Sequence, residues 1–370
     1  MRRLCRTILI VIASTVMGSG VGNAQAADDW PRAGLAEAGF APNLGEQIDA
    51  GVRSGRFENL HAVLITRGGR LVLERYYEGV DERWGRPLGR KTFAAGDLHD
   101  LRSVTKSIVG LLYGIARADG SVPPPGAALV DQFPEYPNLA ADPRRQRMTV
   151  AHALSMMLGT EWDESLSYAD PRNSEHAMEL ADDRYRFVLD RPMVAEPGAQ
   201  WVYNGGATAL LARLIVKGSG QPIKKFAVER LFRPLGIGDI DWVQGRDGAY
   251  IAASGLRLRP RDLAKIGQLV LNGGQWNGEQ IVPVEWLALS FETRAQVDDI
   301  YYGYHWWLGP KSAGGQRWIA GFGNGGQRLF VLPPLDLQVV VMAGNYNQPD
   351  AWKLPVAIIT EIVFPGLRRE

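Results

Sequence analysis

The sequence predicts an α+β fold in which an antiparallel sheet is built from segments near both ends of the chain and a mainly helical lobe is inserted between them. Two observations indicate this. Short runs rich in β-branched residues lie around residues 60–77 and 316–342, whereas the apolar residues of the middle of the chain follow helical spacing. Pairing the two strand-rich ends in one sheet is the simplest assembly, because all of the strands then share one core.

The strand predictions depend on residue type and on turn residues. Residues 61–66 and 70–77 are apolar and β-branched, and Gly68 and Gly69 between them indicate a β-hairpin. Residues 351–363 are predicted to form a closing helix. Three further predicted strands precede that helix: 316–320, 328–332 and 337–342.

Helical periodicity dominates the middle of the chain. We therefore expect a sheet lobe from about residues 50–100 and 250–370, with a helical lobe from about residues 101–249 between them. The segments in which apolar residues recur three or four positions apart are 104–118, 150–157, 208–217 and 264–271.

Composition and charge narrow the classes of partner. The chain has 370 residues, of which 46% are hydrophobic, and 41 basic side chains nearly balance 40 acidic ones. Because the basic residues are scattered and the net charge is only +1, no broad positive field exists to bind nucleic acid or an anionic membrane. The composition is that of a soluble, globular, enzyme-sized protein.

The N-terminus has the three parts of a secretory signal. Arg2, Arg3 and Arg6 precede the apolar run 7–17, and Ala24-Gln25-Ala26 follows. We expect cleavage after Ala26, which leaves a mature domain of residues 27–370 that is periplasmic or secreted from a bacterium. An uncleaved anchor is the alternative, although the run is short for a membrane span, and no stable insertion is expected after cleavage.

Histidine and cysteine spacing gives no sign of a metal or redox centre. The only cysteine, Cys5, lies in the segment predicted to be removed, so the mature chain has no thiol for a disulfide, a nucleophile or a metal. The five histidines show neither H-x-x-x-H nor H-E-x-x-H spacing. From the sequence we therefore predict no metal and no cofactor.

The first chemical motif is Ser103-Val104-Thr105-Lys106, which begins an apolar helical segment. Residues three apart share a helix face, so the Lys106 amine can lie beside the Ser103 hydroxyl. Serine becomes a good nucleophile when a base takes its proton, and a desolvated lysine can be that base. The helix N-terminus would also stabilise an oxyanion. An S-x-x-K spacing arises by chance about once in a chain this long, so a solvated Lys106 is the alternative.

The second motif is the stretch from Pro197-Gly198 to Tyr203, which leads into an apolar helix. A phenol held near a lysine ammonium ionises more readily than one in water, and it can relay a proton to a leaving group. Taken alone, Tyr203 is more typical of an aromatic anchor at the start of a helix.

The third motif is the glycine-rich segment 321–327, which falls between two predicted strands. Glycine within a strand pattern indicates a bulge or a close approach of another backbone. A substrate carbonyl that approaches a strand N–H needs such clearance. A flexible hairpin loop is the alternative.

In this order, Ser103-x-x-Lys106, the Tyr203 stretch and the glycine-rich segment resemble the serine β-lactamase and penicillin-binding superfamily, whose motifs are S-x-x-K, Y-x-N or S-x-N, and K-T-G. The chain is most similar to the class C-like esterases and aminohexanoate-dimer hydrolases of that superfamily. The resemblance extends from about Leu60 to the C-terminus and implies a β-lactamase/transpeptidase-like fold. The stretches that carry it are 101–107, 162–164, 191–193, 201–204, 255–258, 261–264, 302–307 and 325–327.

The resemblance also implies roles for single residues. Ser103 would be the acylated nucleophile, Lys106 the general base, and Tyr203 the group that passes the proton to the leaving group. The oxyanion hole would combine the backbone N–H of Ser103 with that of Asn324, with residues 321–323 as the counterpart of K-T-G. The implied substrate-binding residues are Tyr168, Asn204, Gly323, Gly325 and Trp307.

Two positions depart from the superfamily pattern. Gly205 replaces the Asn expected two residues after Tyr203, and Gly321 replaces the Lys of K-T-G. In β-lactamases these side chains help to bind the β-lactam amide and carboxylate, so we expect weak or no β-lactamase activity. The prediction is a serine hydrolase that cleaves an uncharged ester or amide through an acyl-enzyme. The alternative is a protein that is acylated without turnover and senses penicillins or cell-wall peptides.

Overall fold

The computed structural model describes residues 30–310 and 317–368, and its described residues from 31 onward group into one unit. The predicted signal peptide, residues 1–26, lies outside the described residues, so cleavage and export stay predictions. The first residue of the predicted strand 316–320 also lies outside them. Among the described residues, no helix has the length and apolar character that crossing a membrane requires.

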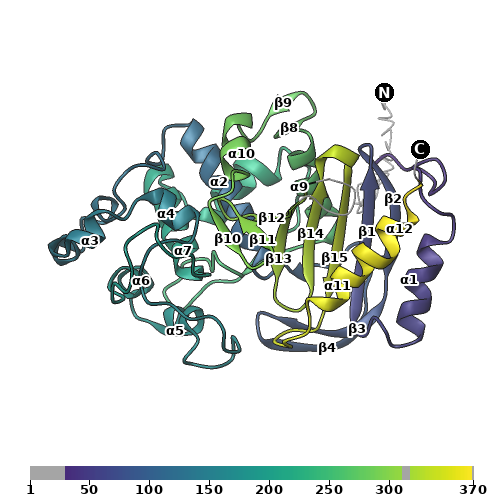
Figure 1. The fold of residues 1–370 in the computed structure, drawn as a ribbon, viewed down its shortest axis with the longest axis horizontal. Coiled ribbons are helices and arrows are strands. Elements are labelled where there is room, and N and C mark those ends of the chain that lie inside the picture. Colours follow the sequence, from purple (N-terminus) through teal and green to yellow (C-terminus); the bar gives the residue numbers. More distant parts are fainter. Residues whose placement is uncertain (1–29, 311–316, 369–370) are drawn as a thin grey trace, which may run out of the picture. The chain divides into compact units, whose positions relative to one another are not determined.

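An eight-stranded antiparallel sheet joins the two ends of this unit, as predicted (Figure 1). Strand β1 (Leu60–Arg67) pairs with β2 (Arg70–Tyr76) in the predicted hairpin and with β15 (Leu337–Ala343) on its other side. The strand order is β10-β11-β12-β13-β14-β15-β1-β2. The remaining strands of this sheet are β10 (Ala295–Val297), β11 (Ile300–Tyr302), β12 (Trp307–Leu308), β13 (Ile319–Gly323) and β14 (Gln327–Leu332).

Helices cover both faces of this sheet, which is why its central strands are buried at nearly every position. On one face, α1 (Leu44–Arg53) and the C-terminal helical segments enclose a core that includes Val341 and Ile358. On the other face, α9 (Pro260–Leu271) packs on β1, β14 and β15, and α2 (Val104–Ala118) packs on β13 (Figure 1). The sheet therefore places its β13 edge beside the start of α2.

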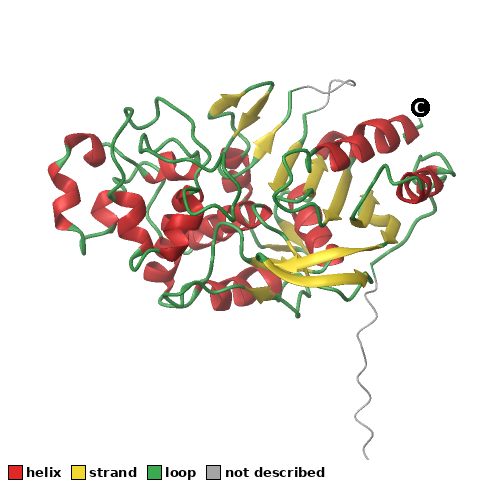
Figure 2. Cartoon of the chain, turned by 90° about the horizontal axis from the view of Figure 1, so that it is seen from below, coloured by secondary structure: helices red, strands yellow, loops and turns green. Residues whose placement is uncertain are grey.

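The middle of the chain is a helical lobe, as expected (Figure 2). Helix α7 is central to it, since α2, α4, α5, α6 and α8 all contact it. Two short π-helical segments, Val228–Phe232 and Ile358–Val363, follow α8 and α11. The other helices are α3 (Pro143–Gln146), α4 (Val150–Leu154), α5 (Ser174–Leu180), α6 (Arg184–Leu189), α7 (Gly205–Ser219), α8 (Ile223–Ala227), α10 (Val284–Ser290), α11 (Lys353–Ala357) and α12 (Phe364–Gly366).

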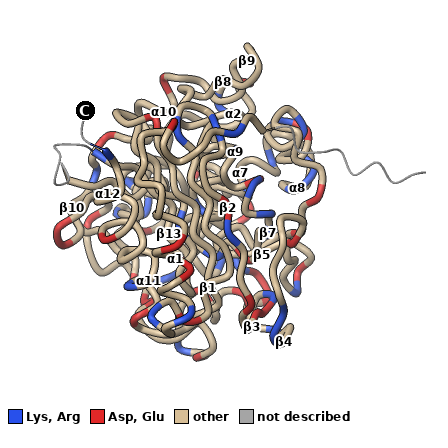
Figure 3. Tube along the Cα trace, turned by 90° about the vertical axis from the view of Figure 1, so that its right-hand side faces the viewer, with Lys and Arg blue, Asp and Glu red and all other residues tan. Residues whose placement is uncertain are grey.

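Three small sheets were not predicted from the sequence. The hairpin β3 (Glu78–Arg83) and β4 (Arg86–Thr92) extends beside the main sheet (Figures 1 and 3). Most of β4 is exposed and it contains Pro87 and Gly89, so it lacks the alternation that indicates a half-buried strand. The other short strands are β5 (His99–Asp100), β6 (Asp241–Trp242), β7 (Leu256–Leu258), β8 (Gln275–Trp276) and β9 (Glu279–Gln280).

Charged residues of both signs are interspersed along the chain (Figure 3).

One prediction about the glycine-rich segment was wrong in detail. Gly321 and Gly323 lie within β13, and only Asn324, Gly325 and Gly326 form the turn to β14. A β-carbon at 321 would press on Val104 and Ser107 of α2, and one at 323 would meet the Leu101 carbonyl. Glycine therefore lets this strand pack closely against the start of α2.

Candidate active site

The predicted nucleophile, Ser103, lies at the N-cap of α2. The contacts of the preceding residue, Arg102, support its position. Arg102 has a left-handed backbone (φ +49°), a conformation that costs free energy and needs support from its surroundings. Its buried guanidinium pairs with Glu82 and with Asp100 (Nε to Oδ2, 3.1 Å) and stacks on the ring of Tyr346. Ser103 occupies the N-cap without using its side chain as a cap, which leaves the hydroxyl available.

Lys106 lies directly beneath Ser103, as the motif predicted. Its ammonium donates hydrogen bonds to Ser103 Oγ (3.1 Å), to the Ala253 carbonyl (3.1 Å) and to Glu175 Oε2 (3.2 Å), so each of its three protons has an acceptor. The side chain is 1% exposed. Burial disfavours its charge, but the negative charges around it, that of Glu175 first, outweigh burial and raise the pKa of Lys106. Lys106 is therefore an ammonium before substrate binds.

Glu175 is the principal residue that sequence reasoning missed. It lies in the first turn of α5, where Asn173 caps the helix, and Ser254 Oγ donates to its second oxygen at 2.6 Å. A β-carbon on Gly205 would collide with the Glu175 carboxylate. The carboxylate therefore occupies the space that a side chain at position 205 would need. The only available signal was the glycine where the resemblance calls for Asn.

Glu164 is a second carboxylate of the site, and it is half-buried. It accepts hydrogen bonds from the Gly205 N–H (2.5 Å), Trp162 Nε1 (2.7 Å) and the Tyr168 hydroxyl (2.9 Å). Burial and then the nearby Glu175 charge raise the pKa of Glu164 to about 7, against the opposing influence of Lys106. The resemblance included Glu164 in a matched stretch but assigned it no role.

Tyr203 completes the predicted trio. The Lys106 ammonium lies 4.8 Å from the centre of its ring, and the Tyr203 side chain is hydrogen-bonded to Ser103. Burial raises the pKa of the phenol, and the Lys106 charge offsets only part of the rise. On its other side the ring stacks on Trp307 at 5.9 Å, which in turn stacks on Phe322 at 5.2 Å. Tyr203 is therefore a neutral phenol, and it can donate a proton.

Two adjoining cavities of about 300 Å³ each open at Ser103, which is the size of a small-molecule site. Ser103, Tyr168 and Asn324 line both of them. One is bounded by Trp84, Glu175 and His176. The other is lined mainly by aromatic side chains and by glycine backbone. Its lining residues include Trp201, Tyr203, Trp307, Phe322, Gly323, Gly325, Gly326, Arg328 and Trp352.

The remaining predicted site residues divide into two groups. Tyr168, Trp307, Gly323, Gly325 and Asn324 line the cavities. Asn204 does not line either of them: it is 2% exposed, and its side chain accepts the Ala207 N–H at 2.9 Å. This side chain caps α7, so it has a structural role, and the substrate-binding role is not supported.

Comparison with known proteins agrees with this arrangement. A family model described as Beta-lactamase matches residues 57–354, most of the chain. The chain belongs to the beta-lactamase family. Within this family it is 24% identical over 312 residues to the 6-aminohexanoate-dimer hydrolase of Paenarthrobacter ureafaciens, which covers 78% of this chain and 73% of the relative. It is also 26% identical over 220 residues to the lovastatin esterase of Penicillium rubens, covering 52% of this chain and 53% of that one.

Solved structures share the beta-lactamase-family fold. A putative 6-aminohexanoate-dimer hydrolase from Bacillus anthracis superposes with a TM-score of 0.70 at 20% identity, covering 91% of this chain and 87% of that one. EstCE1, a hydrolase with promiscuous acyltransferase activity, superposes with a TM-score of 0.68 at 16% identity, covering 88% and 97%. Together with the family match, these findings establish the predicted fold class and identify the protein as a serine hydrolase.

The raised pKa of Glu164 predicts a pH-dependent stability. In the unfolded chain this carboxyl titrates near 4.5, and in the folded protein near 7. Between these values the folded state binds more protons, so the contribution of Glu164 to the free energy of unfolding is lost as pH rises through that window. We expect the difference between wild type and Glu164→Gln to change by on the order of 1–3 kcal/mol between about pH 4.5 and about pH 8, measured by urea unfolding. A pH-independent difference would contradict the shift.

Proposed function

We propose that this serine hydrolase cleaves an ester or amide bond of a small molecule through an acyl-enzyme on Ser103. One observation carries the proposal: Ser103 Oγ lies at the mouth of two cavities, 3.1 Å from the Lys106 ammonium and hydrogen-bonded to the Tyr203 side chain. These contacts give the hydroxyl both a route for its proton and space for a substrate carbonyl.

Because Lys106 is already an ammonium, it can accept the Ser103 proton only if it gives one of its own protons to another group. As Ser103 attacks the carbonyl carbon, its hydroxyl proton moves to Lys106 Nζ and one Lys106 proton moves to Glu175 Oε2, 3.2 Å away. When the C–O or C–N bond breaks, the Tyr203 phenol gives its proton to the leaving group. Lys106 then reprotonates Tyr203 and takes its own proton back from Glu175, so no net charge has built up in the buried site. Water then attacks the acyl carbon, and the bond between Ser103 Oγ and the acyl group breaks as that oxygen takes up a proton, which releases the acid and restores the enzyme.

The oxyanion that forms on the carbonyl needs donors at the helix start. Ser103 precedes the first turn of α2, and among the described residues no backbone carbonyl accepts its N–H. Asn324 lines both cavities, with its side chain held by Asn347 (3.2 Å and 2.7 Å). We assign the backbone N–H groups of Ser103 and Asn324 to the oxyanion hole.

The walls of the site favour an apolar, uncharged acyl group over a β-lactam. Position 321 faces Val104 and Ser107 of α2 across a gap that even a β-carbon would fill, so the lysine of K-T-G has no place there. The aromatic surface of Trp307 and Phe322 lies beside the nucleophile. Such a wall binds acyl chains by burial of apolar area.

The experiment compares acylation with turnover. Wild-type protein should react with a fluorophosphonate at Ser103 and should hydrolyse nitrophenyl esters of short fatty acids in a burst followed by steady turnover, with slower turnover of linear amides. A chromogenic cephalosporin should be a poor substrate. A burst without turnover on every ester and amide would instead support the sensor alternative, and rapid cephalosporin hydrolysis would refute the proposed specificity.

A further inference from the structure

His61, His99 and Asp81 form a buried cluster of possible metal ligands behind the active site. They come from β1, β5 and β3, and their exposed fractions are 0%, 1% and 1%. One ligand atom of each lies within 4.8 Å of the others. His61 Nδ1 and His99 Nε2 are only 2.8 Å apart. The proposed reaction gives this cluster no role.

The hydrogen bonds of the two histidines fix their tautomers. His99 Nδ1 lies 3.0 Å from the Asp100 carbonyl oxygen, so this nitrogen must carry the hydrogen. His61 Nε2 lies 3.3 Å from Asn59 Oδ1. That atom is the amide oxygen, because it accepts the Val80 N–H (2.6 Å) while Asn59 Nδ2 donates to the Val80 carbonyl (3.1 Å). His61 Nε2 must therefore also be a donor.

With His61 Nε2 and His99 Nδ1 protonated, the other two nitrogens, His61 Nδ1 and His99 Nε2, point their lone pairs at each other. This arrangement is repulsive unless a cation lies between them. That cation is either a shared proton or a metal ion. A metal-bound histidine commonly donates its second ring N–H to a carbonyl or carboxylate oxygen, which is the pattern seen here.

Asp81 supplies the third ligand. Its Oδ1 accepts from the Tyr346 hydroxyl at 3.1 Å, whereas Oδ2 is buried and has no hydrogen-bond partner. The nearest cation to Oδ2, Arg257, is 3.8 Å away and also pairs with Asp100 at 3.3 Å. An unsatisfied buried carboxylate oxygen is costly without a cation.

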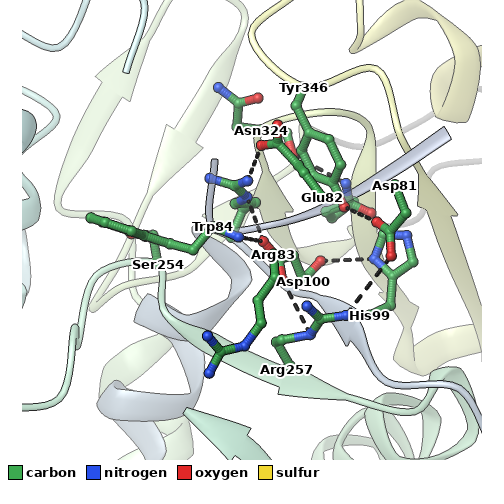
Figure 4. A network of polar contacts seen from close by, with 12 residues as sticks. Asp81, Glu82, Arg83, Trp84, His99, Asp100, Ser254, Arg257, Asn324 and Tyr346 are labelled. Carbon is green, nitrogen blue, oxygen red and sulfur yellow. Dashed lines mark hydrogen bonds and ion pairs between the residues drawn. The ribbon is translucent and has the colours of Figure 1, made fainter. Parts of the chain in front are cut away.

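The charges around the cluster leave a place for one more cation. Asp81, Asp100 and Glu82 carry three negative charges, and Arg102 and Arg257 carry two positive ones (Figure 4). Two other nearby cations have carboxylate partners of their own: Lys91 pairs with Asp97 at 2.7 Å, and Arg83 pairs with Asp241 at 2.6 Å. This excess of one negative charge is what a bound cation would remove.

We propose that His61 Nδ1, His99 Nε2 and Asp81 Oδ2 bind one divalent transition-metal ion of the zinc class. Two imidazoles and one carboxylate are the ligands that Zn²⁺ and Co²⁺ accept in proteins. The two nitrogens are 2.8 Å apart, which is close to the distance between two ligand atoms on one such ion. To bind the ion, the two rings would move slightly apart. The ion sits behind the Asp100–Arg102 pair that supports Ser103, so its role is structural.

The test uses the full protein without a polyhistidine tag. Metal is removed by a chelator and one metal, Zn²⁺ or Co²⁺, is returned. We expect one equivalent to bind per chain and the melting temperature to rise. With Co²⁺, we also expect visible absorption of a four-coordinate nitrogen and oxygen site. His99→Gln and Asp81→Asn should each weaken binding by at least about tenfold. His152→Gln, in the helical lobe, should leave binding unchanged.

Wild-type protein that binds no Zn²⁺ or Co²⁺ above the level of the buffer overturns the proposal, whether or not the variants fold. Binding that His99→Gln and Asp81→Asn retain, or that His152→Gln removes, overturns it as well. If the wild type binds no metal and its NMR spectrum shows a strongly deshielded proton between the two rings, the cation of this cluster is a shared proton.

Discussion

Ser103→Ala is expected to lower kcat on a nitrophenyl ester by at least about 10⁴-fold, with little change in KM. The Ser103 hydroxyl is the only nucleophile placed at the junction of the two cavities in the proposed reaction, and the remaining donors can only polarise the substrate carbonyl. Steady-state kinetics and intact-protein mass spectrometry after fluorophosphonate treatment measure the effect.

Ser107→Ala is the matched control. Ser107 lies one turn further along α2, and its hydroxyl donates to the His305 carbonyl at 2.7 Å, away from the substrate. We expect it to lose about 1 kcal/mol of stability and to keep its activity. Activity retained by Ser103→Ala would refute the assignment of the nucleophile.

Glu175→Gln is expected to lower kcat/KM by about 10²-fold or more and to destabilise the fold by roughly 3–5 kcal/mol. The buried Lys106 ammonium loses its carboxylate partner, and the Glu175 charge is the largest of the influences that oppose burial and raise the pKa of Lys106. In the proposed mechanism Lys106 also loses the group that takes its proton. The pH–rate profile should shift, whereas a purely structural role for Glu175 would change stability alone.

Glu179→Gln separates these two effects. Glu179 lies on the same helix and is also buried, but its partner is Arg184, which has a second carboxylate in Asp247. We expect this variant to be less stable than wild type and to keep its kcat and its pH–rate profile. An unchanged kcat in folded Glu175→Gln would refute the role of Glu175 in proton transfer.

The sequence predicted the elements that depend on neighbouring residues better than the contacts between residues far apart in the chain. The β1–β2 hairpin, β14, β15 and α2 were predicted nearly to the residue, because turn glycines, β-branched runs and helical spacing are local signals. The β3–β4 hairpin was not predicted, since β4 is largely exposed and the positions that β3 buries, Gly79 and Asp81, are not apolar side chains. The cap formed by Asn204 was mistaken for a binding residue, because an N-cap and a ligand contact use the same residue type.

The sequence by itself determined the fold class and the pairing of Ser103 with Lys106 across one turn of α2, whereas the assignment of Tyr203 as their partner came from the resemblance of the motifs to those of the beta-lactamase superfamily. Those features follow from helix geometry and from motif order. Only the tertiary structure decided what surrounds Lys106, because Glu175 reaches it from 69 residues away and fills the space beside Gly205. It likewise brought His61 within hydrogen-bonding distance of His99, 38 residues on. No spacing rule detects such a contact, since the packing of separate strands, and not the chain between them, sets the distance.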